Sequence, residues 1–295
     1  MKITLLDGGM GQELVHRSSA PPTPLWSTQI MMDQPELVRD VHADYFAAGA
    51  DIATTNTYAI HRDRLVKAGV EGQFETLHDI ALTQAETARA AHGRGRIAGS
   101  IGPLGASYRP DVHPALADAT PLYAEIAAIL APRVDLIICE TVASLAHARA
   151  ILDGACDQGK PVWLALTVDD EDGTRLRSGE ALADVLSIAE GRAAALLANC
   201  SAPEAMPAAL DTMARAGLPF GAYANGFTQI TKDFLKDDPT VDALSARRDL
   251  GPEAYARHAL DWVARGATII GGCCEVGPAH IAEISRQLAP EDALT

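Results

Sequence analysis

The sequence lacks the patterns that mark several common enzyme classes. It has no G-x-G-x-x-G loop, no Walker loop and no G-x-S-x-G elbow, so dinucleotide-binding, P-loop and serine-nucleophile chemistries have no support. Its nine histidines form no H-x-H or H-E-x-x-H pattern, and no two cysteines have C-x-x-C spacing. These absences argue against a barrel hydrolase whose metal is held by histidines.

Positive charge and long apolar runs are also scarce. Asp and Glu number 39 against 24 Lys and Arg, for a formal net charge of −15. Because phosphate backbones and anionic lipid surfaces attract clustered cations, we expect neither a nucleic-acid partner nor a membrane partner. No apolar run approaches the ~20 residues of a membrane span, and Asp7 interrupts the first run too early for a signal peptide. Five cysteines in 295 residues do not make a disulfide framework, so we expect a cytoplasmic protein with reduced thiols.

What the sequence does contain is a regular alternation of strand and helix patterns. Eight short, nearly continuous apolar runs are typical of strands buried on both faces. They are residues 3–7, 51–55, 97–101, 135–140, 162–168, 194–200, 219–224 and 267–271. Helical patterns separate them, at residues 35–48, 73–91, 117–131, 145–157, 180–190, 203–216, 252–265 and 278–288. The alternation predicts an α/β fold, a single-domain (β/α)8 TIM barrel over residues 1–295, with a doubly wound open sheet as the alternative.

The barrel prediction has a functional consequence, because active sites of this fold lie at the C-terminal ends of the strands. The polar or small residues at or just past those ends are Asp7, Asn56, Gly102, Glu140, Cys200, Asn225 and Cys273. The fold would aim them at one shared opening. The longest connection, residues 225–251, is either a lid over that opening or a solvated surface excursion.

The tetrad Gly271-Gly272-Cys273-Cys274 is the most informative stretch. It places two thiols behind one predicted strand, and Cys200 ends another. Three sulfurs at strand ends can converge on one thiophilic ion, and zinc with three protein ligands keeps a fourth position for water or substrate. Neighbouring strand residues point to opposite faces, so Cys273 and Cys274 reach one ion only where the backbone turns, which Gly271-Gly272 makes possible.

The adjacent thiols could also have a role without a metal. Free cysteines pack like small apolar residues, and Cys273 and Cys274 could instead form a vicinal disulfide. Cys139 lies inside a predicted strand and alternates away from the face of Glu140, so we expect it to fill the core. Cys156 lies in a predicted helix, where we expect a structural role.

Carboxylates at two strand ends would suit an amino-acid substrate. Asp7 either belongs to a simple turn or accepts a hydrogen bond from a substrate ammonium, with Gly8 allowing close backbone approach. Glu140 either binds an amine or caps the following helix. Trp26 and Tyr58 lie near the predicted opening, where they either face a sulfonium or quaternary ammonium group through cation–π attraction or simply pack.

Seven short motifs, taken together and in order, resemble the homocysteine S-methyltransferases. They are Asp7-Gly8-Gly9-Met10-Gly11, Leu25-Trp26-Ser27, Asn56-Thr57-Tyr58, Ser100-Ile101-Gly102-Pro103, Glu140-Thr141, Asn199-Cys200 and Gly271-Gly272-Cys273-Cys274. The resemblance implies a zinc-dependent (β/α)8 barrel that makes methionine from homocysteine. It also implies an onium methyl donor such as betaine, S-methylmethionine or S-adenosylmethionine, or methylfolate with cobalamin in larger enzymes.

Carried over to this chain, the resemblance implies that Cys200, Cys273 and Cys274 are the zinc thiolates. It implies that Asp7, Gly8 and Glu140 bind the amino-acid part of homocysteine. Asn225 is a further candidate substrate contact, but Asn225-Gly226-Phe227 departs from the Asn-Ser-Gly stretch of members that use S-methylmethionine, so the donor stays open.

A stand-alone enzyme, monomeric or a small homo-oligomer, fits the resemblance best, because no folate or cobalamin module is attached. Two alternatives remain. One is a non-catalytic zinc- or thiol-binding barrel, and the other is a methyltransferase with a different thiol or selenol acceptor.

Overall fold

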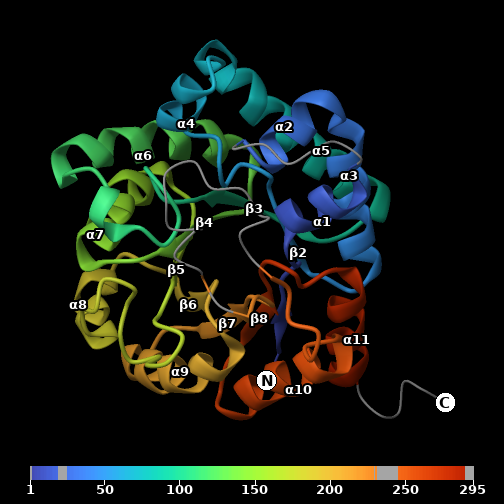
Figure 1. The fold of residues 1–295 in the computed structure, drawn as a ribbon, viewed down its shortest axis with the longest axis vertical. Coiled ribbons are helices and arrows are strands. Elements are labelled where there is room, and N and C mark those ends of the chain that lie inside the picture. Colours follow the sequence, from blue (N-terminus) through green and yellow to red (C-terminus); the bar gives the residue numbers. More distant parts are fainter. Residues whose placement is uncertain (1, 19–24, 229, 231–244, 290–295) are drawn as a thin grey trace.

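Eight parallel strands form one sheet with helices arranged around it (Figure 1). The computed structural model describes residues 2–18, 25–228, 230 and 245–289. The strands are β1 (Thr4–Leu5), β2 (Ile52–Thr54), β3 (Arg96–Ile101), β4 (Leu136–Val142), β5 (Val162–Leu166), β6 (Ala195–Asn199), β7 (Phe220–Ala224) and β8 (Ile269–Gly272). Their order is β1-β8-β7-β6-β5-β4-β3-β2, and a parallel bridge between Leu6 and Ile52 joins the two ends. The predicted (β/α)8 barrel is confirmed, and the doubly wound alternative is wrong.

More helices are present than the sequence pattern predicted. They are α1 (Met10–Arg17), α2 (Ser27–Asp33), α3 (Pro35–Ala47), α4 (Arg62–Lys67), α5 (Phe74–His92), α6 (Leu116–Leu130), α7 (Leu145–Ala155), α8 (Val185–Ala189), α9 (Met206–Met213), α10 (Pro252–Ala264) and α11 (Pro278–Leu288). The additional helices α1, α2 and α4 are short and lie in the connections that follow β1 and β2. Among the described residues, no helix is long and apolar enough to cross a membrane.

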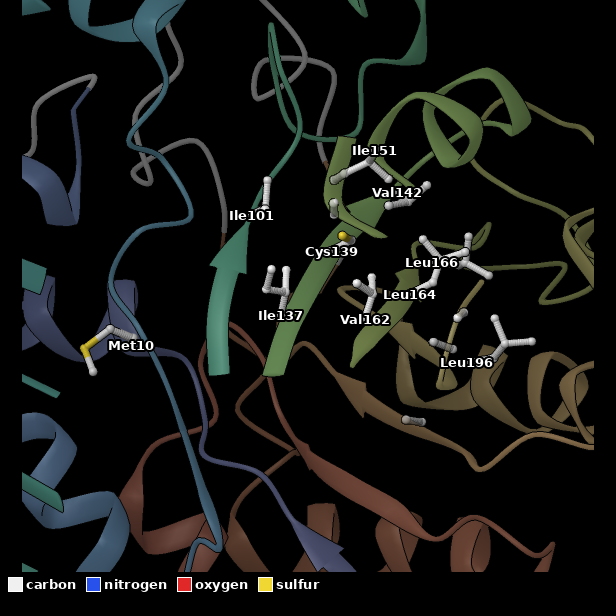
Figure 2. Packing of buried hydrophobic residues seen from close by; sticks show 14 of the residues in the cluster. Met10, Ile101, Ile137, Cys139, Val142, Ile151, Val162, Leu164, Leu166 and Leu196 are labelled. Atoms are coloured by element: carbon white, nitrogen blue, oxygen red, sulfur yellow. The ribbon is translucent and has the colours of Figure 1, made fainter. Parts of the chain in front are cut away.

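The alternation of β4 determines which of its side chains face the barrel interior. Ile137 and Cys139 pack outward against the helices, in the layer that Figure 2 shows. Ile138 packs inward with interior side chains such as Trp163 and Leu197. Cys139 is fully buried, as expected for a core residue, and the alternation that turns it outward directs its neighbour Glu140 into the barrel.

The C-terminal end of β4 is irregular. Its pairing with β5 shifts register between Cys139 and Val142, and Thr141 has a positive φ of 57°. Asn199, at the end of β6, supports this shape: its Oδ1 accepts from the Thr141 N–H at 3.1 Å, and its Nδ2 donates to the Thr141 Oγ1 at 3.2 Å. A bulge of this kind re-aims a side chain, and here it fixes Glu140 at the inner face of the strand end.

His42 in α3 provides a pH-dependent test of the packing. It is fully buried, neither ring nitrogen has a hydrogen-bond partner among the described residues, and burial lowers its pKa from 6.5 to about 3. Between these values the unfolded chain binds a proton that the folded chain does not, so stability falls as the pH falls below 6.5. Relative to His42→Leu, the wild-type protein should lose about 2 kcal/mol of unfolding free energy between pH 7 and pH 5.

Urea unfolding of both proteins at the two pH values measures this difference. The other titrating groups are common to both proteins and cancel in the comparison. An identical pH dependence for wild type and His42→Leu would contradict the buried, neutral state of this imidazole.

Candidate active site

A cavity of about 120 Å³ opens at the C-terminal ends of the strands. The candidate residues that line it are Asp7, Gly8, Trp26, Tyr58, Glu140, Cys200, Cys273 and Cys274. The cavity therefore joins a sulfur-rich wall, two carboxyl groups and several aromatic rings. Asn225 is buried but does not line the cavity; its Oδ1 accepts from the Phe227 N–H at 3.2 Å.

The three sulfurs of the wall come from two connections of the barrel whose strands, β6 and β8, lie on either side of β7. Cys200 directly follows β6, and Cys273 and Cys274 directly follow β8. All three Sγ atoms lie within 4.8 Å of one another, close enough to hold one metal ion. The cluster is the only group of three potential metal ligands that meets this distance among the residues the structure describes.

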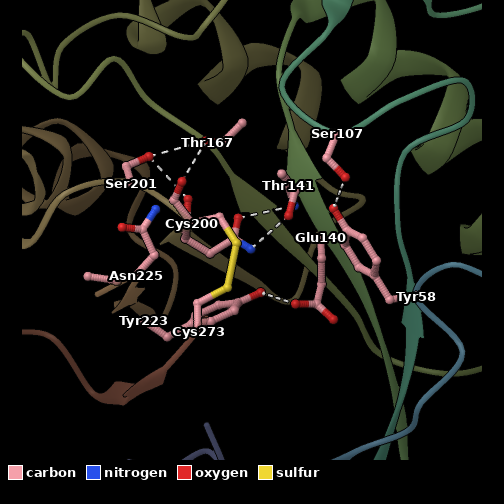
Figure 3. The surroundings of a disulfide bond; sticks show 12 residues. Tyr58, Ser107, Glu140, Thr141, Thr167, Cys200, Ser201, Tyr223, Asn225 and Cys273 are labelled. Atoms are coloured by element: carbon pink, nitrogen blue, oxygen red, sulfur yellow. Dashed lines mark hydrogen bonds between the residues drawn. A yellow bond between two sulfur atoms is a disulfide. The ribbon is translucent and has the colours of Figure 1, made fainter. Parts of the chain in front are cut away.

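Two of these sulfurs are joined to each other, which differs from the reduced thiols expected from the sequence. Cys200 and Cys273 form a disulfide, and Cys274 is free (Figure 3). Thiols that converge on one point with no cation between them are placed to bond to each other when oxidised. The predicted vicinal alternative, a bond between Cys273 and Cys274, is wrong.

The turn that brings Cys273 and Cys274 together follows Gly271 and Gly272, whereas the sequence predicted that these two glycines form it. Gly271 and Gly272 belong to β8, whereas the chain turns at residues 273–276, with Glu275 at a φ of 64° and the Val276 N–H donating to the Cys273 carbonyl at 3.1 Å. The glycines serve close packing instead. A Cβ on Gly271 would lie 2.6 Å from the Leu6 Cβ, and one on Gly272 would overlap the Val276 side chain.

Cys200 occupies a backbone conformation that non-glycine residues rarely adopt. Its φ is 50°, which costs on the order of 1–3 kcal/mol and persists only where surrounding contacts enforce it. Its N–H donates to the Tyr223 carbonyl at 3.3 Å, and its own carbonyl accepts from the Thr167 Oγ1 at 3.2 Å. These bonds tie the residue after β6 to the neighbouring strands on both sides.

Asp7 lies almost fully buried, two residues past the end of β1. Its carboxylate accepts from the Thr54 N–H at 2.6 Å and from the Thr54 hydroxyl at 2.7 Å. Burial raises the pKa of Asp7 to about 7; the bonds from Thr54 act against this shift, and the nearby Glu140 adds to it. The next residue, Gly8, packs closely against the backbone of Val276. A Cβ at this position would overlap the Val276 carbonyl oxygen.

Glu140 is the second buried carboxyl group of the cavity. The Ser100 hydroxyl donates to one of its oxygens. The Tyr223 hydroxyl donates to the other at 3.1 Å, as Figure 3 shows. Burial raises its pKa above the ordinary value, and both hydrogen bonds act in the opposite direction. Neither Glu140 nor Asp7 forms an ion pair with any described residue, so the cavity offers two carboxyl groups to a cationic ligand.

Aromatic side chains form much of the remaining wall. Trp26 precedes α2, and the Tyr58 hydroxyl bonds to the Ser107 hydroxyl at 2.8 Å. Sequence reasoning missed Tyr108 and Phe227, which also line the cavity. They pack with Cys200 in one apolar cluster that Trp26, Cys273 and Cys274 adjoin. The signal that could have found Tyr108 was its position in the connection after β3, close behind the Ser100–Pro103 motif.

Part of the connection after β7 also reaches the opening, through Phe227. The Phe227–Ala246 bridge and the bond from the Arg247 N–H to the Gly226 carbonyl, at 2.7 Å, fix its two ends. Most of the 225–251 segment proposed as a lid, residues 229 and 231–244, lies outside the described residues.

Comparison with known proteins identifies the family of this chain. Residues 4–288 match the family model described as homocysteine S-methyltransferase. The chain belongs to the homocysteine S-methyltransferase family. It is therefore a methyltransferase, and the resemblance carried by the seven sequence motifs is confirmed at the level of the family.

Relatives within the homocysteine S-methyltransferase family match along nearly their whole length. The homocysteine S-methyltransferase of Escherichia coli is 31% identical over 307 residues, covering 97% of this chain and 95% of the relative. The crystal structure of the E. coli homocysteine methyltransferase MmuM in its metallated form superposes with a TM-score of 0.82 at 29% identity, covering 97% of this chain and 96% of that one. The oxidized form of the same protein matches with the same TM-score, identity and coverage.

Proposed function

We propose that this enzyme transfers a methyl group from an onium donor to the thiol of homocysteine, giving methionine, with zinc held by Cys200, Cys273 and Cys274. The observation that carries the proposal is the shared cavity. Three convergent sulfurs lie in the same space as two buried carboxyl groups that pair with no cation in the part of the chain that the structure describes. That combination suits a substrate with both a thiol and an ammonium group.

The donor set fits zinc on chemical grounds. Sulfur ligands favour zinc over hard cations such as magnesium or calcium, and three protein ligands are typical of catalytic zinc sites. Burial, followed by the negative charge of Glu275, raises the pKa of Cys274 to about 12, so near neutral pH this thiol is protonated, and a cation bound next to it would favour the thiolate. The disulfide between Cys200 and Cys273 removes two thiolates, so metal binding requires its reduction. The E. coli relative has crystal structures in a metallated and in an oxidized form, which supports a metal-bound and an oxidised state for this chain.

Zinc bound there would stabilise the substrate thiol as a thiolate, the nucleophilic form of sulfur. The carboxylates of Asp7 and Glu140 would hold the ammonium group of homocysteine and so orient its thiol toward the sulfur wall. Thr54 fixes the Asp7 carboxylate, while Ser100 and Tyr223 fix that of Glu140. Their placement before substrate arrives lowers the entropic cost of alignment.

The aromatic side chains would receive the methyl donor. Trp26, Tyr58, Tyr108 and Phe227 line the cavity, and all of these except Tyr58 pack in or against the apolar cluster of the cysteines. Aromatic faces attract sulfonium and quaternary ammonium groups. In the transfer, the homocysteine sulfur forms a bond to the methyl carbon. The bond from that carbon to the donor's sulfur or nitrogen breaks, and its electron pair leaves with the neutralised donor. The thiol proton passes to solvent.

A matrix of methyl donors against acceptors tests the proposal. The purified, reduced and zinc-loaded protein is incubated with homocysteine and betaine, dimethylsulfoniopropionate, S-methylmethionine or S-adenosylmethionine, and methionine is quantified. We expect about one zinc per chain and methionine formation with at least one donor. Bound zinc without transfer to any acceptor would indicate the non-catalytic barrel. Transfer to another thiol or selenol but not to homocysteine would indicate the other alternative.

A further inference from the structure

An arginine outside the cavity contacts the segment that carries Cys200. Arg177 lies in the connection between β5 and α8, and its side chain is only 13% exposed. It does not line the cavity. We propose that Arg177 is a positioning residue for Cys200, holding this sulfur in place for the metal. The inference rests on the zinc site of the proposed function.

The first contact of Arg177 is a bidentate ion pair with Asp170. Its Nη1 donates to the Asp170 Oδ2 at 2.9 Å, and its Nη2 donates to the Oδ1 at 2.7 Å. The same Oδ1 accepts from the Ala202 N–H at 2.8 Å. Since Ala202 is two residues beyond Cys200, the ion pair anchors the chain on the C-terminal side of the cysteine. A planar guanidinium matches a carboxylate in this geometry, whereas a lysine ammonium does not.

The second contact runs through Thr167 to Cys200 itself. The Arg177 Nε donates to the Thr167 Oγ1 at 3.3 Å, and this hydroxyl donates to the Cys200 carbonyl at 3.2 Å. A direct contact from the Arg177 Nη2 to the same carbonyl is 3.5 Å long and therefore weak. The backbone around Cys200 is thus held at two points: Thr167 binds the Cys200 carbonyl, and Asp170 binds the N–H of Ala202. These bonds account for the positive φ that a cysteine would not adopt alone.

The third contact joins Arg177 to the cavity wall. Its guanidinium carbon lies 5.4 Å from the ring centroid of Tyr108, within the range of cation–π attraction. Tyr108 packs in the same apolar cluster as Cys200. One side chain therefore links the connections after β3, β5 and β6 at the edge of the sulfur wall. Outer residues that orient ligands in this way typically change metal affinity by about 10–100-fold when removed.

Zinc affinity of the reduced protein, measured by competition with a chromophoric chelator, tests the proposal. Arg177→Met should weaken zinc binding at least about tenfold. Arg177→Lys, which keeps the charge but not the planar fork, should restore only part of the affinity. Asp170→Asn should also weaken binding, because the ion pair is lost while the Ala202 N–H keeps an acceptor. Arg175→Met is the matched control: Arg175 lies on the same connection and its side chain is 58% exposed, so affinity should be unchanged.

Cobalt substitution supplies a readout that loss of stability alone would not change. The sulfur-to-cobalt absorption bands of Arg177→Met should differ from those of wild type, because the Cys200 sulfur is misplaced. Wild-type zinc affinity and unchanged cobalt spectra in both Arg177→Met and Asp170→Asn would overturn the proposal. If circular dichroism shows that Arg177→Met does not fold, Asp170→Asn decides alone. A wild-type protein that binds no zinc would overturn both this inference and the proposed zinc site. A wild-type protein that binds zinc, with variants of unchanged zinc affinity, would overturn only the role of Arg177.

Discussion

Zinc binding and methionine formation should both be lost when Cys273 is replaced by alanine. The three sulfurs lie within 4.8 Å of one another, so removing one leaves two ligands and breaks the site. The loss of activity should exceed the roughly 10–100-fold that removal of an outer residue of a metal site causes. Zinc content by elemental analysis and methionine formation with an accepted donor are the two measurements.

Cys156→Ala is the matched control for this substitution. Its thiol is part-buried near the end of α7 and contacts the Arg192 carbonyl, so both zinc and activity should be retained. Oxidised wild-type protein should take up zinc only after reduction, because the Cys200–Cys273 disulfide uses two of the three sulfurs. Full activity in a metal-free Cys273→Ala protein would contradict the role of the sulfur wall.

The strands were predictable because a barrel strand is buried on both faces and is therefore apolar along its length. The run 194–200, for example, becomes β6 with its ends moved by one residue. Helices α1, α2 and α4 were missed because the alternation predicts one helix per connection, whereas these short helices precede α3 and α5 in the connections after β1 and β2. The sequence likewise carries no sign of the register shift in β4, which depends on its pairing with β5.

The candidate site was predictable as far as strand ends alone determine it. Because parallel strands end at the same side of a barrel, Asp7, Glu140 and the three cysteines could be expected to meet. Their partners could not. Thr54, Ser100 and Tyr223 reach the carboxylates only through the pairing of distant strands, and Arg177 reaches Cys200 across a connection between β5 and α8. Such contacts depend on three-dimensional neighbours that no local pattern identifies.

Asp7→Asn and Glu140→Gln should each raise the KM for homocysteine about 100-fold. Loss of a buried, charged hydrogen bond costs about 2–5 kcal/mol, and a factor of ten corresponds to about 1.4 kcal/mol. Zinc content should remain at the wild-type level, because neither carboxylate belongs to the sulfur cluster. Asp44→Asn on the outer surface of α3, where the side chain is 52% exposed, is the matched control. A wild-type KM in both variants would contradict binding of the substrate ammonium at these residues.

The pH dependence of kcat/KM for homocysteine adds a test specific to Asp7. Burial raises the pKa of this carboxyl group to about 7 in the ligand-free protein, so below that pH it is protonated and cannot pair with an ammonium group. The contribution of Asp7 to kcat/KM should therefore fall as the pH decreases from 8 to 6 and level off above about 8. In Asp7→Asn this component should disappear, while any change that arises from other groups persists. If the two profiles are parallel throughout, Asp7 does not titrate in the step that captures homocysteine, which would contradict its proposed pairing with the ammonium group.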